Sequence, residues 1–314
     1  MNHLVWRLHR NQAFFAVGAL VVLAVVLLVT GHVMRDDYTS AAASCGATQT
    51  CDQLGLLFRG DGAIMDLVQL TLIVPLLFGL FWGAPMLSKE FEDGTHNLAW
   101  TQGVSRRRWL RANIGWSLVA AALWGAALAA LVSYWRYPEN AINSRFDAFD
   151  IQGIVPVAYA LFAVALGIAV GSVIRRVLPS LAATLAVFVG LRAAVGLWLR
   201  PHYLAPITKL FPLLSSGGPP NNAWILSSSF VNGQGRVLGD RMGIDEFPAA
   251  CRTAVLGGKG IRGQCLAEHG WHQMFTYQPD SRFWAFQGIE AGIFVVLALV
   301  LVGFATWWVL KLDA

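Results

Sequence analysis

The sequence predicts an all-α polytopic membrane protein with six transmembrane helices. Of its 314 residues, 56% are hydrophobic and only 13% are charged, whereas soluble domains carry roughly 25% charged residues. The mean hydropathy is positive, at +0.55. Apolar runs of about 20 residues recur along the chain. A helix of that length crosses roughly 30 Å of hydrocarbon with its own backbone hydrogen bonds satisfied.

The spans are predicted from these runs. We expect them at residues 13–33, 63–86, 112–135, 151–174, 178–199 and 283–310. The first run is longer than the apolar core of a secretory signal, so we expect it to be retained. Leu4, Val5 and Leu8 stand at helical spacing against Arg7 and Arg10. This favours a short interfacial helix on the inner surface, or an ordinary basic flank.

Lysine and arginine in the short loops predict the orientation. With a cytoplasmic N-terminus, ten basic residues lie inside and four lie in short outside loops. The inside set is Arg7, Arg10, Lys89, Arg106, Arg107, Arg108, Arg111, Arg175, Arg176 and Lys311, and the outside set is Arg35, Arg59, Arg136 and Arg145. Both termini are therefore expected in the cytoplasm. Arginine outnumbers lysine 19 to 4, which fits a bacterial plasma (inner) membrane protein from a high-GC source.

All four cysteines fall outside the cytoplasm in this topology. Cys45 and Cys51 lie between the first two spans, and Cys251 and Cys265 lie between the last two. Disulfides persist outside the cytosol. Three pairings are possible, and we favour the two pairs within one loop. Zinc binding is the alternative, but the spacings are not C-x-x-C, and we predict no metal.

The segment 200–282 is the one large elaboration of what we expect to be a single membrane domain over residues 1–314. It is rich in Gly, Pro, Ser and Asn, and it carries aromatic residues suited to a membrane interface, such as Trp224 and Trp271. We expect an ordered external loop held by a disulfide.

Residues 88–111, "SKEFEDGTHNLAWTQGVSRRRWLR", form a strongly charged loop between the second and third spans. Acidic residues come first and arginines follow. Gly94 and Thr95 can end one helical piece and begin another, and Ser105 can cap the third span. Alternatively, the arginines simply anchor to anionic lipid while the acids are solvated.

This loop resembles the corresponding loop of the type-2 ATP-binding-cassette exporter permeases, particularly their actinobacterial branch. The matching order is a span, "EFEDGT" at 90–95, a short helix, "VSRRR" at 104–108 and the next span. The order of an inner-surface helix, six spans and an elaborated last external loop is also similar. Gly103 departs from the pattern, since many members have proline there. Arg111 also departs, since it stands near a position where many members have lysine.

The resemblance implies a coupling helix that docks on a separate ATPase. Seven residues would form or flank this docking element: Glu90, Glu92, Gly94, Thr95, Arg106, Arg107 and Arg108. The implied function is that of a permease subunit of an ATP-driven exporter for a hydrophobic or amphipathic substrate, such as a drug, a lipid or a modified peptide.

The implied partners are the cytosolic ATPase, a second copy of the chain or a paralogous permease, and membrane lipid, with no nucleic acid. ATP and Mg would bind in the ATPase and no cofactor would bind directly here. In agreement, the one Walker-like fragment, "LGGKG" at 256–260, lacks the required spacing and the Ser or Thr after lysine.

Charges inside spans are rare because each is costly in hydrocarbon unless it is paired or hydrated. Arg192 and Glu290 lie at comparable depths from the outer ends of the fifth and sixth spans. We expect them to pair as a clamp or an external gate, with snorkelling of Arg192 to the surface as the alternative. Asp66 and Gln69 on the second span are candidates for the translocation path, although Asp66 also suits a span boundary.

Small residues at four-residue spacing let membrane helices pack closely. Such G-x-x-x-G pairs occur at Gly79/Gly83, Gly167/Gly171 and Gly288/Gly292. Packing within one subunit is favoured for each pair over a dimer seam.

Enzymatic function is the alternative class, in the form of an integral membrane enzyme acting on a lipid-linked substrate at the external face. His269 and His272 stand at i and i+3, but H-E-x-x-H and G-x-S-x-G are both absent. We therefore predict no catalytic residues. A scaffold or sensor is the third class, and it would leave the charged loop at 88–111 without a role.

Overall fold

The computed structural model describes residues 2–44, 62–92, 105–213, 218–239, 246–252 and 259–311. The chain divides into two compact units, and each has its own architecture. The helical unit comprises Met1–Glu139, Ala148–Leu197 and Trp284–Ala314. The sheet unit comprises Asn140–Asp147 and Trp198–Phe283.

The prediction of six spans is confirmed, because six helices in the described part of the chain are long and apolar enough to cross a membrane. The long helices are α1 (Asn2–Ser44), α6 (Arg106–Trp135), α8 (Val155–Ile174), α9 (Val177–Ala194, continued by the π-helical η5, Val195–Leu199) and α11 (Phe283–Lys311). The second span is segmented into α2 (Gly62–Leu70), the 3₁₀ turn η2 (Thr71–Ile73), α3 (Val74–Phe78), the π-helical η3 (Gly79–Gly83) and α4 (Ala84–Glu92). Between α6 and α8 lie α7 (Tyr137–Asn140) and η4 (Arg145–Ala148).

The first helix differs from the prediction at both ends. α1 runs without a break from Asn2, so the expected interfacial helix is not a separate element. It also continues past Val33 into a charged stretch. There the Arg35 guanidinium lies 4.1 Å from the centre of the Tyr134 ring, and the Ser40 hydroxyl donates to the Asp36 carbonyl. The Arg35 contact ties this stretch of α1 to α6, and an apolar pattern alone does not predict it.

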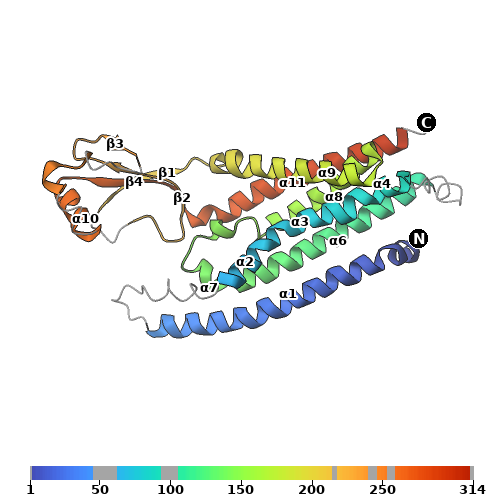
Figure 1. Cartoon of the computed structure of the whole chain (residues 1–314), viewed down its shortest axis with the longest axis horizontal. Coiled ribbons are helices and arrows are strands. Elements are labelled where there is room, and N and C mark those ends of the chain that lie inside the picture. Colours follow the sequence, from blue (N-terminus) through green and yellow to red (C-terminus); the bar gives the residue numbers. More distant parts are fainter. Residues whose placement is uncertain are drawn as a thin grey trace. The chain divides into compact units, whose positions relative to one another are not determined.

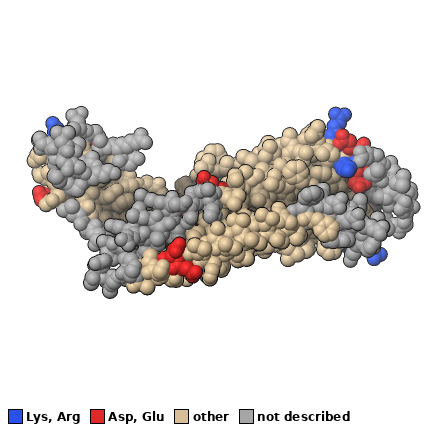
Figure 2. Space-filling view, turned by 60° about the horizontal axis from the view of Figure 1, so that its bottom comes forward, with Lys and Arg blue, Asp and Glu red and all other residues tan. Residues whose placement is uncertain are grey.

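The helices of this unit run alongside one another (Figure 1), and α8 packs against α3, α4, α6 and α9. The labelled N and C ends of the chain and the end of α4 lie at the same end of the unit (Figure 1). Figure 2 shows the sides of the helices as mostly tan, with Lys, Arg, Asp and Glu gathered toward their ends. This distribution is that of a bundle whose flanks face hydrocarbon.

The core of the unit is built around α8, which is buried along most of its length. The ring of Phe162 lies 5.9 Å from that of Phe188 on α9 and 5.2 Å from that of Phe294 on α11. A second cluster joins α1, α2 and α6 through Leu27, Val68 and Trp135.

Four glycines bring the second span and α8 into backbone contact. A Cβ added at Gly79 would lie 2.6 Å from the Ala163 carbonyl oxygen, and one at Gly167 would lie 2.5 Å from the Gly79 carbonyl oxygen. Gly83 and Gly171 are equally close to backbone of the facing helix. These two G-x-x-x-G pairs therefore pack on each other within one subunit.

The third pair, Gly288 and Gly292 on α11, is different. No atom in the described part of the chain lies within 4 Å of a Cβ added at either glycine.

The sheet unit corrects the expectation of an all-α chain. It holds β1 (Ile207–Pro212), β2 (Trp224–Val231), β3 (Val237–Leu238) and β4 (His272–Gln278), in the antiparallel order β1-β4-β2-β3. Its short helices are α10 (Lys259–Glu268), η6 (Arg200–His202), η8 (Ala249–Cys251) and η10 (Asp280–Arg282). The strands are rich in β-branched and aromatic residues, which fit a half-buried pleated surface. The loop-like composition of the segments between them concealed this pattern.

The predicted disulfide between Cys251 and Cys265 is confirmed, and it joins η8 to α10. It lies in a small core with Phe247, Leu266 and Trp271. Cys45 and Cys51 lie outside the described residues.

Residues Asn140–Asp147, between the third and fourth spans, belong to the sheet unit. The Arg145 guanidinium forms a two-pronged ion pair with the Asp280 carboxylate, with Nε at 2.7 Å from Oδ1 and Nη2 on Oδ2. The Phe146 ring stacks on that of Trp224. The unit thus joins two predicted external loops.

Candidate functional site

Two polar sites stand out in the helical unit, and the first is at the ends of α4 and α6. Glu90 and Glu92 lie in the last turn of α4, and α6 begins at Arg106. Arg107 and Arg108 are exposed in the first turn of α6. Gly94 and Thr95 lie outside the described residues, as does the rest of 93–104. The two flanks of the predicted coupling loop thus lie at the end of one candidate span and at the start of the next.

Ser105 is only partly what the sequence predicted. It occupies the N-cap position of α6 with extended backbone, and its carbonyl accepts from the amides of Arg108 and Trp109. Its side chain makes no capping hydrogen bond. The Ser105 hydroxyl therefore accepts no hydrogen bond from the first amides of α6, and the prediction of a side-chain cap is wrong.

Glu92 contacts a different helix. Its Oε2 accepts a hydrogen bond of 2.8 Å from the amide of Val177, the first residue of α9. The first amides of a helix have no partner within it and carry partial positive charge, so a carboxylate from another helix satisfies both needs. The family resemblance implied a role for Glu92 in ATPase coupling, and nothing in the sequence predicted this contact.

The turn that presents this amide is very short. α8 ends at Ile174, Arg175 adopts a left-handed conformation with φ of 59°, and Arg176 is extended. The Arg175 guanidinium lies 5.2 Å from the centre of the Phe91 ring, in cation–π geometry. Residues of α4 therefore hold both sides of the α8–α9 turn.

The second site is a buried polar cluster formed by α8, α9, α11 and the segment before α8. Tyr159, on α8, is at its centre. The Tyr159 hydroxyl lies 2.8 Å from Asp150 Oδ1 and also hydrogen-bonds Glu290 Oε1. Tyr159 and Glu290 are fully buried. The Arg192 guanidinium lies 4.4 Å from the centre of the Tyr159 ring.

Arg192 makes two further contacts in this cluster. Its Nη2 lies 3.6 Å from Asp150 Oδ1, and its Nη1 donates to the Leu72 carbonyl at 3.0 Å. Leu72 is in the 3₁₀ turn η2, where the donor three residues on would be Pro75. Proline has no N–H, so the guanidinium takes the place of an amide donor at position 75. The structure thus joins Arg192 to Glu290 by way of Tyr159.

Gln287, one turn before Glu290, supports the same region. Its Oε1 accepts from the amides of Ile154 and Val155 at 2.9 and 3.0 Å, and its Nε2 donates to the Phe149 carbonyl at 2.9 Å. The side chain is fully buried and caps the start of α8 from α11. Gln287 and Glu290 stand at i and i+3 in an otherwise apolar helix, and this spacing was a signal available in the sequence.

The other predicted residues lie apart from these contacts. Asp66 and Gln69 are exposed on α2. Their position on a span agrees with the sequence, and their role in a path stays a prediction.

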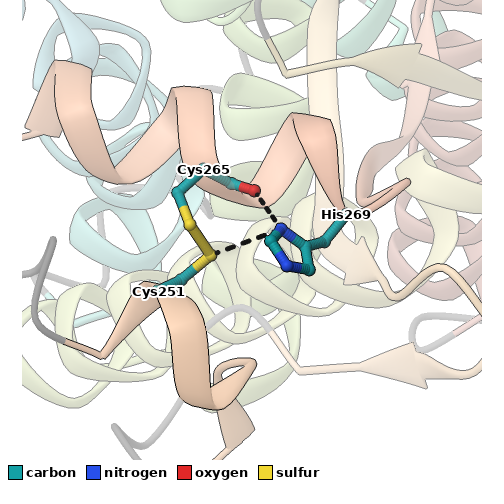
Figure 3. Close-up of side chains that lie close together, drawn as sticks. All are labelled: Cys251, Cys265 and His269. Carbon is teal, nitrogen blue, oxygen red and sulfur yellow. Dashed lines mark hydrogen bonds between the residues drawn. A yellow bond between two sulfur atoms is a disulfide. The ribbon is translucent and has the colours of Figure 1, made fainter.

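The cysteines of the sheet unit form a compact group with His269 (Figure 3). The His269 Nδ1 lies 2.8 Å from the Cys265 carbonyl oxygen and 3.7 Å from Cys251 Sγ. These three side chains are spaced as metal ligands are. However, the two sulfurs are bonded to each other, and metals bind the thiolate form. In this form the group is a structural bridge.

One comparison with known proteins identifies the family. A family model described as ABC-2 membrane transporter related matches residues 17–200, more than half of the chain and its first five candidate spans. The comparisons with curated proteins and with solved structures find no match. On the strength of this match and of the six apolar helices, the chain belongs to the ABC-2 membrane transporter related family.

Proposed function

We propose that this chain is the permease subunit of an ATP-driven exporter and works with a separate cytosolic ATPase. The observation that carries the proposal is the family match over the first five spans, together with a sixth helix of suitable length. The family is one of transport components, and pairing with an ATPase subunit is implied by it. Two copies of the chain, or one copy and a paralogous permease, would enclose the path.

The proposed orientation of the chain in the membrane rests on the positions of its basic residues. Arg107, Arg108, Arg175 and Lys311 are exposed at the ends of α6, α8 and α11. Basic residues near span ends favour the cytoplasmic side, so this end would face the cytoplasm of a bacterial plasma membrane. Both termini and the coupling loop would then be cytoplasmic, and the sheet unit would be external.

The working cycle needs an energetic difference between two states. ATP shifts an equilibrium only when it binds the closed ATPase pair more tightly than the open one. Closure would pull on the loop between Glu92 and Arg106, which leads directly into α4 and α6. The central cavity would then change from inward-facing to outward-facing. ATP and Mg would stay in the ATPase.

The substrate class is proposed from the composition of the helices. The spans are apolar, and two charged residues within them, Arg192 and Glu290, already contact Tyr159 in the buried cluster. This favours a hydrophobic or amphipathic molecule, such as a drug, a lipid or a modified peptide.

The test is to purify the tagged protein from its native membrane in mild detergent and to identify what accompanies it. We expect an ATPase whose hydrolysis depends on the permease and loses that dependence in Glu90→Ala. Asp37→Ala is the matched control, because it removes an exposed acid from α1 far along the chain from the loop. If no ATPase accompanies the protein in several detergents, the proposal fails and an enzyme acting on lipid-linked substrates becomes the better explanation.

A further inference from the structure

We infer that Glu92 is a positioning residue that transmits movement of the cytoplasmic loop to α9, which acts as a lever between the loop and the Tyr159 cluster. The inference deepens the proposed function and rests on it. It assigns Glu92 a contact inside the permease, distinct from any contact of the loop with an ATPase.

The frame against which α9 would move is the second span with α8. Backbone-to-backbone contacts at Gly79, Gly83, Gly167 and Gly171 leave no room between these two elements. A pair packed through backbone atoms has no side chains to rearrange, so the two elements are expected to shift together.

α9 packs on both α8 and α4, but less extensively than the second span packs on α8. Its buried side chains are Ser180, Thr184 and Phe188, followed by Val195 in η5. Residues four apart lie on one face, so α9 touches its neighbours along a single narrow stripe. The hydroxyls of Ser180 and Thr184 donate to carbonyls of their own segment, those of the N-cap residue Arg176 and of Ser180. The middle of this stripe therefore slides more easily than it would with hydrogen bonds to another helix.

Polar contacts with the frame occur near the two ends of α9. At one end the Glu92 carboxylate accepts from the Val177 amide at 2.8 Å. At the other, Arg192 contacts the Leu72 carbonyl, Asp150 and the Tyr159 ring. Fifteen residues of helix separate Val177 from Arg192, which is about 22 Å at 1.5 Å per residue. A continuous helix of this length moves as a rod.

The connection to the loop is direct. Glu92 is the last residue of α4, so a pull on the loop reaches its carboxylate within one residue. The carboxylate holds the first amide of α9, and Arg192 lies at the far end of the same helix. Movement at the cytoplasmic end would thereby change the contacts of Arg192 with Asp150 and Tyr159.

The experiment measures distances between spin labels in the purified permease in lipid nanodiscs. One pair joins Leu197, exposed in η5 directly after α9, to Leu123, exposed on α6. The control pair joins Ile154, exposed at the start of α8, to Leu123. In Glu92→Ala we expect the α9 pair to broaden or shift by several ångströms while the α8 pair stays unchanged. Glu92→Gln keeps an oxygen that accepts from the amide, and it should restore the wild-type distances.

A second arm adds the ATPase and ATP. With enough ATPase added to saturate its binding to each variant, we expect ATP to shift the α9 pair in the wild type and in Glu92→Gln, and not in Glu92→Ala. Glu90→Ala is the contrasting variant, because it should weaken stimulation of the ATPase and leave the α9 distance unchanged in the permease alone.

Unchanged α9 distances in Glu92→Ala would overturn the inference, as would an equal change in the α8 pair. The spin-label arm without ATPase uses the permease alone. Failure to find any ATPase therefore refutes the proposed function, and the distance result still decides whether Glu92 positions α9.

Discussion

Removing the Tyr159 hydroxyl tests the buried cluster most simply. Tyr159→Phe keeps the ring beneath Arg192 and deletes the oxygen that contacts Asp150 and Glu290. A hydrogen bond to a charged group contributes about 1.5–3 kcal/mol to stability. One hydroxyl carries one proton, so we count one full bond and expect a loss of about 2–3 kcal/mol. At roughly 2 °C per kcal/mol for a chain of this size, the melting temperature should fall by about 4–6 °C.

The assay is thermal unfolding of the purified protein in detergent, followed by size-exclusion chromatography of the soluble fraction. Tyr137→Phe is the matched control, since Tyr137 is exposed and its ring also lies under an arginine, Arg35. It should unfold within about 1 °C of the wild type, because surface changes of this kind seldom exceed ~0.5 kcal/mol. Equal melting temperatures for the two variants would refute the assignment of Tyr159 as the centre of the cluster.

Three further predictions concern contacts that hold the two units together internally. Gly79→Val should destabilise the protein by about 1–3 kcal/mol or prevent folding, because the valine side chain would collide with the α8 backbone. Gly288→Val is the control, and it should leave the stability of the monomer in thermal unfolding unchanged within ~0.5 kcal/mol. Gln287→Ala removes the acceptor of the amides of Ile154 and Val155. Hydrogen exchange of these amides should become at least tenfold faster. An unchanged exchange rate would contradict the capping role. The double variant Cys251→Ser, Cys265→Ser opens a loop of roughly 15 residues and should lose about 3 kcal/mol. Limited proteolysis should then cut the sheet unit faster and leave the helical unit unaffected, and equal cutting rates would contradict this.

The six spans were predictable because the thickness of the bilayer fixes the length of an apolar helix. The same reasoning drew attention to Arg192 and Glu290, since charge inside a span is rare. What the sequence did not reveal is how they meet. Tyr159 is one tyrosine in an apolar helix, and nothing local distinguishes it from a packing residue.

Contacts between segments that are far apart in the sequence were the features that the sequence predicted least well. Glu92 and Val177 are 85 residues apart, and no periodicity links an acid at the end of one helix to the first amide of another. The G-x-x-x-G pairs Gly79/Gly83 and Gly167/Gly171 were predictable from their four-residue spacing, and the structure confirms that they pack within the subunit. The sheet was missed because β1 and β4, 60 residues apart, pair across a segment with loop-like composition.

The most direct test of the central proposal is to ask what the cytoplasmic loop touches in living cells. A photo-crosslinking amino acid is placed at position 90, at the end of α4, and in a second strain at position 37, exposed on α1. After irradiation, the account predicts that position 90 alone crosslinks to a protein that mass spectrometry identifies as an ATPase with Walker motifs. Crosslinks from both positions to the same ATPase, or an ATPase crosslinked from position 37 alone, would contradict the assignment of this end as the coupling site.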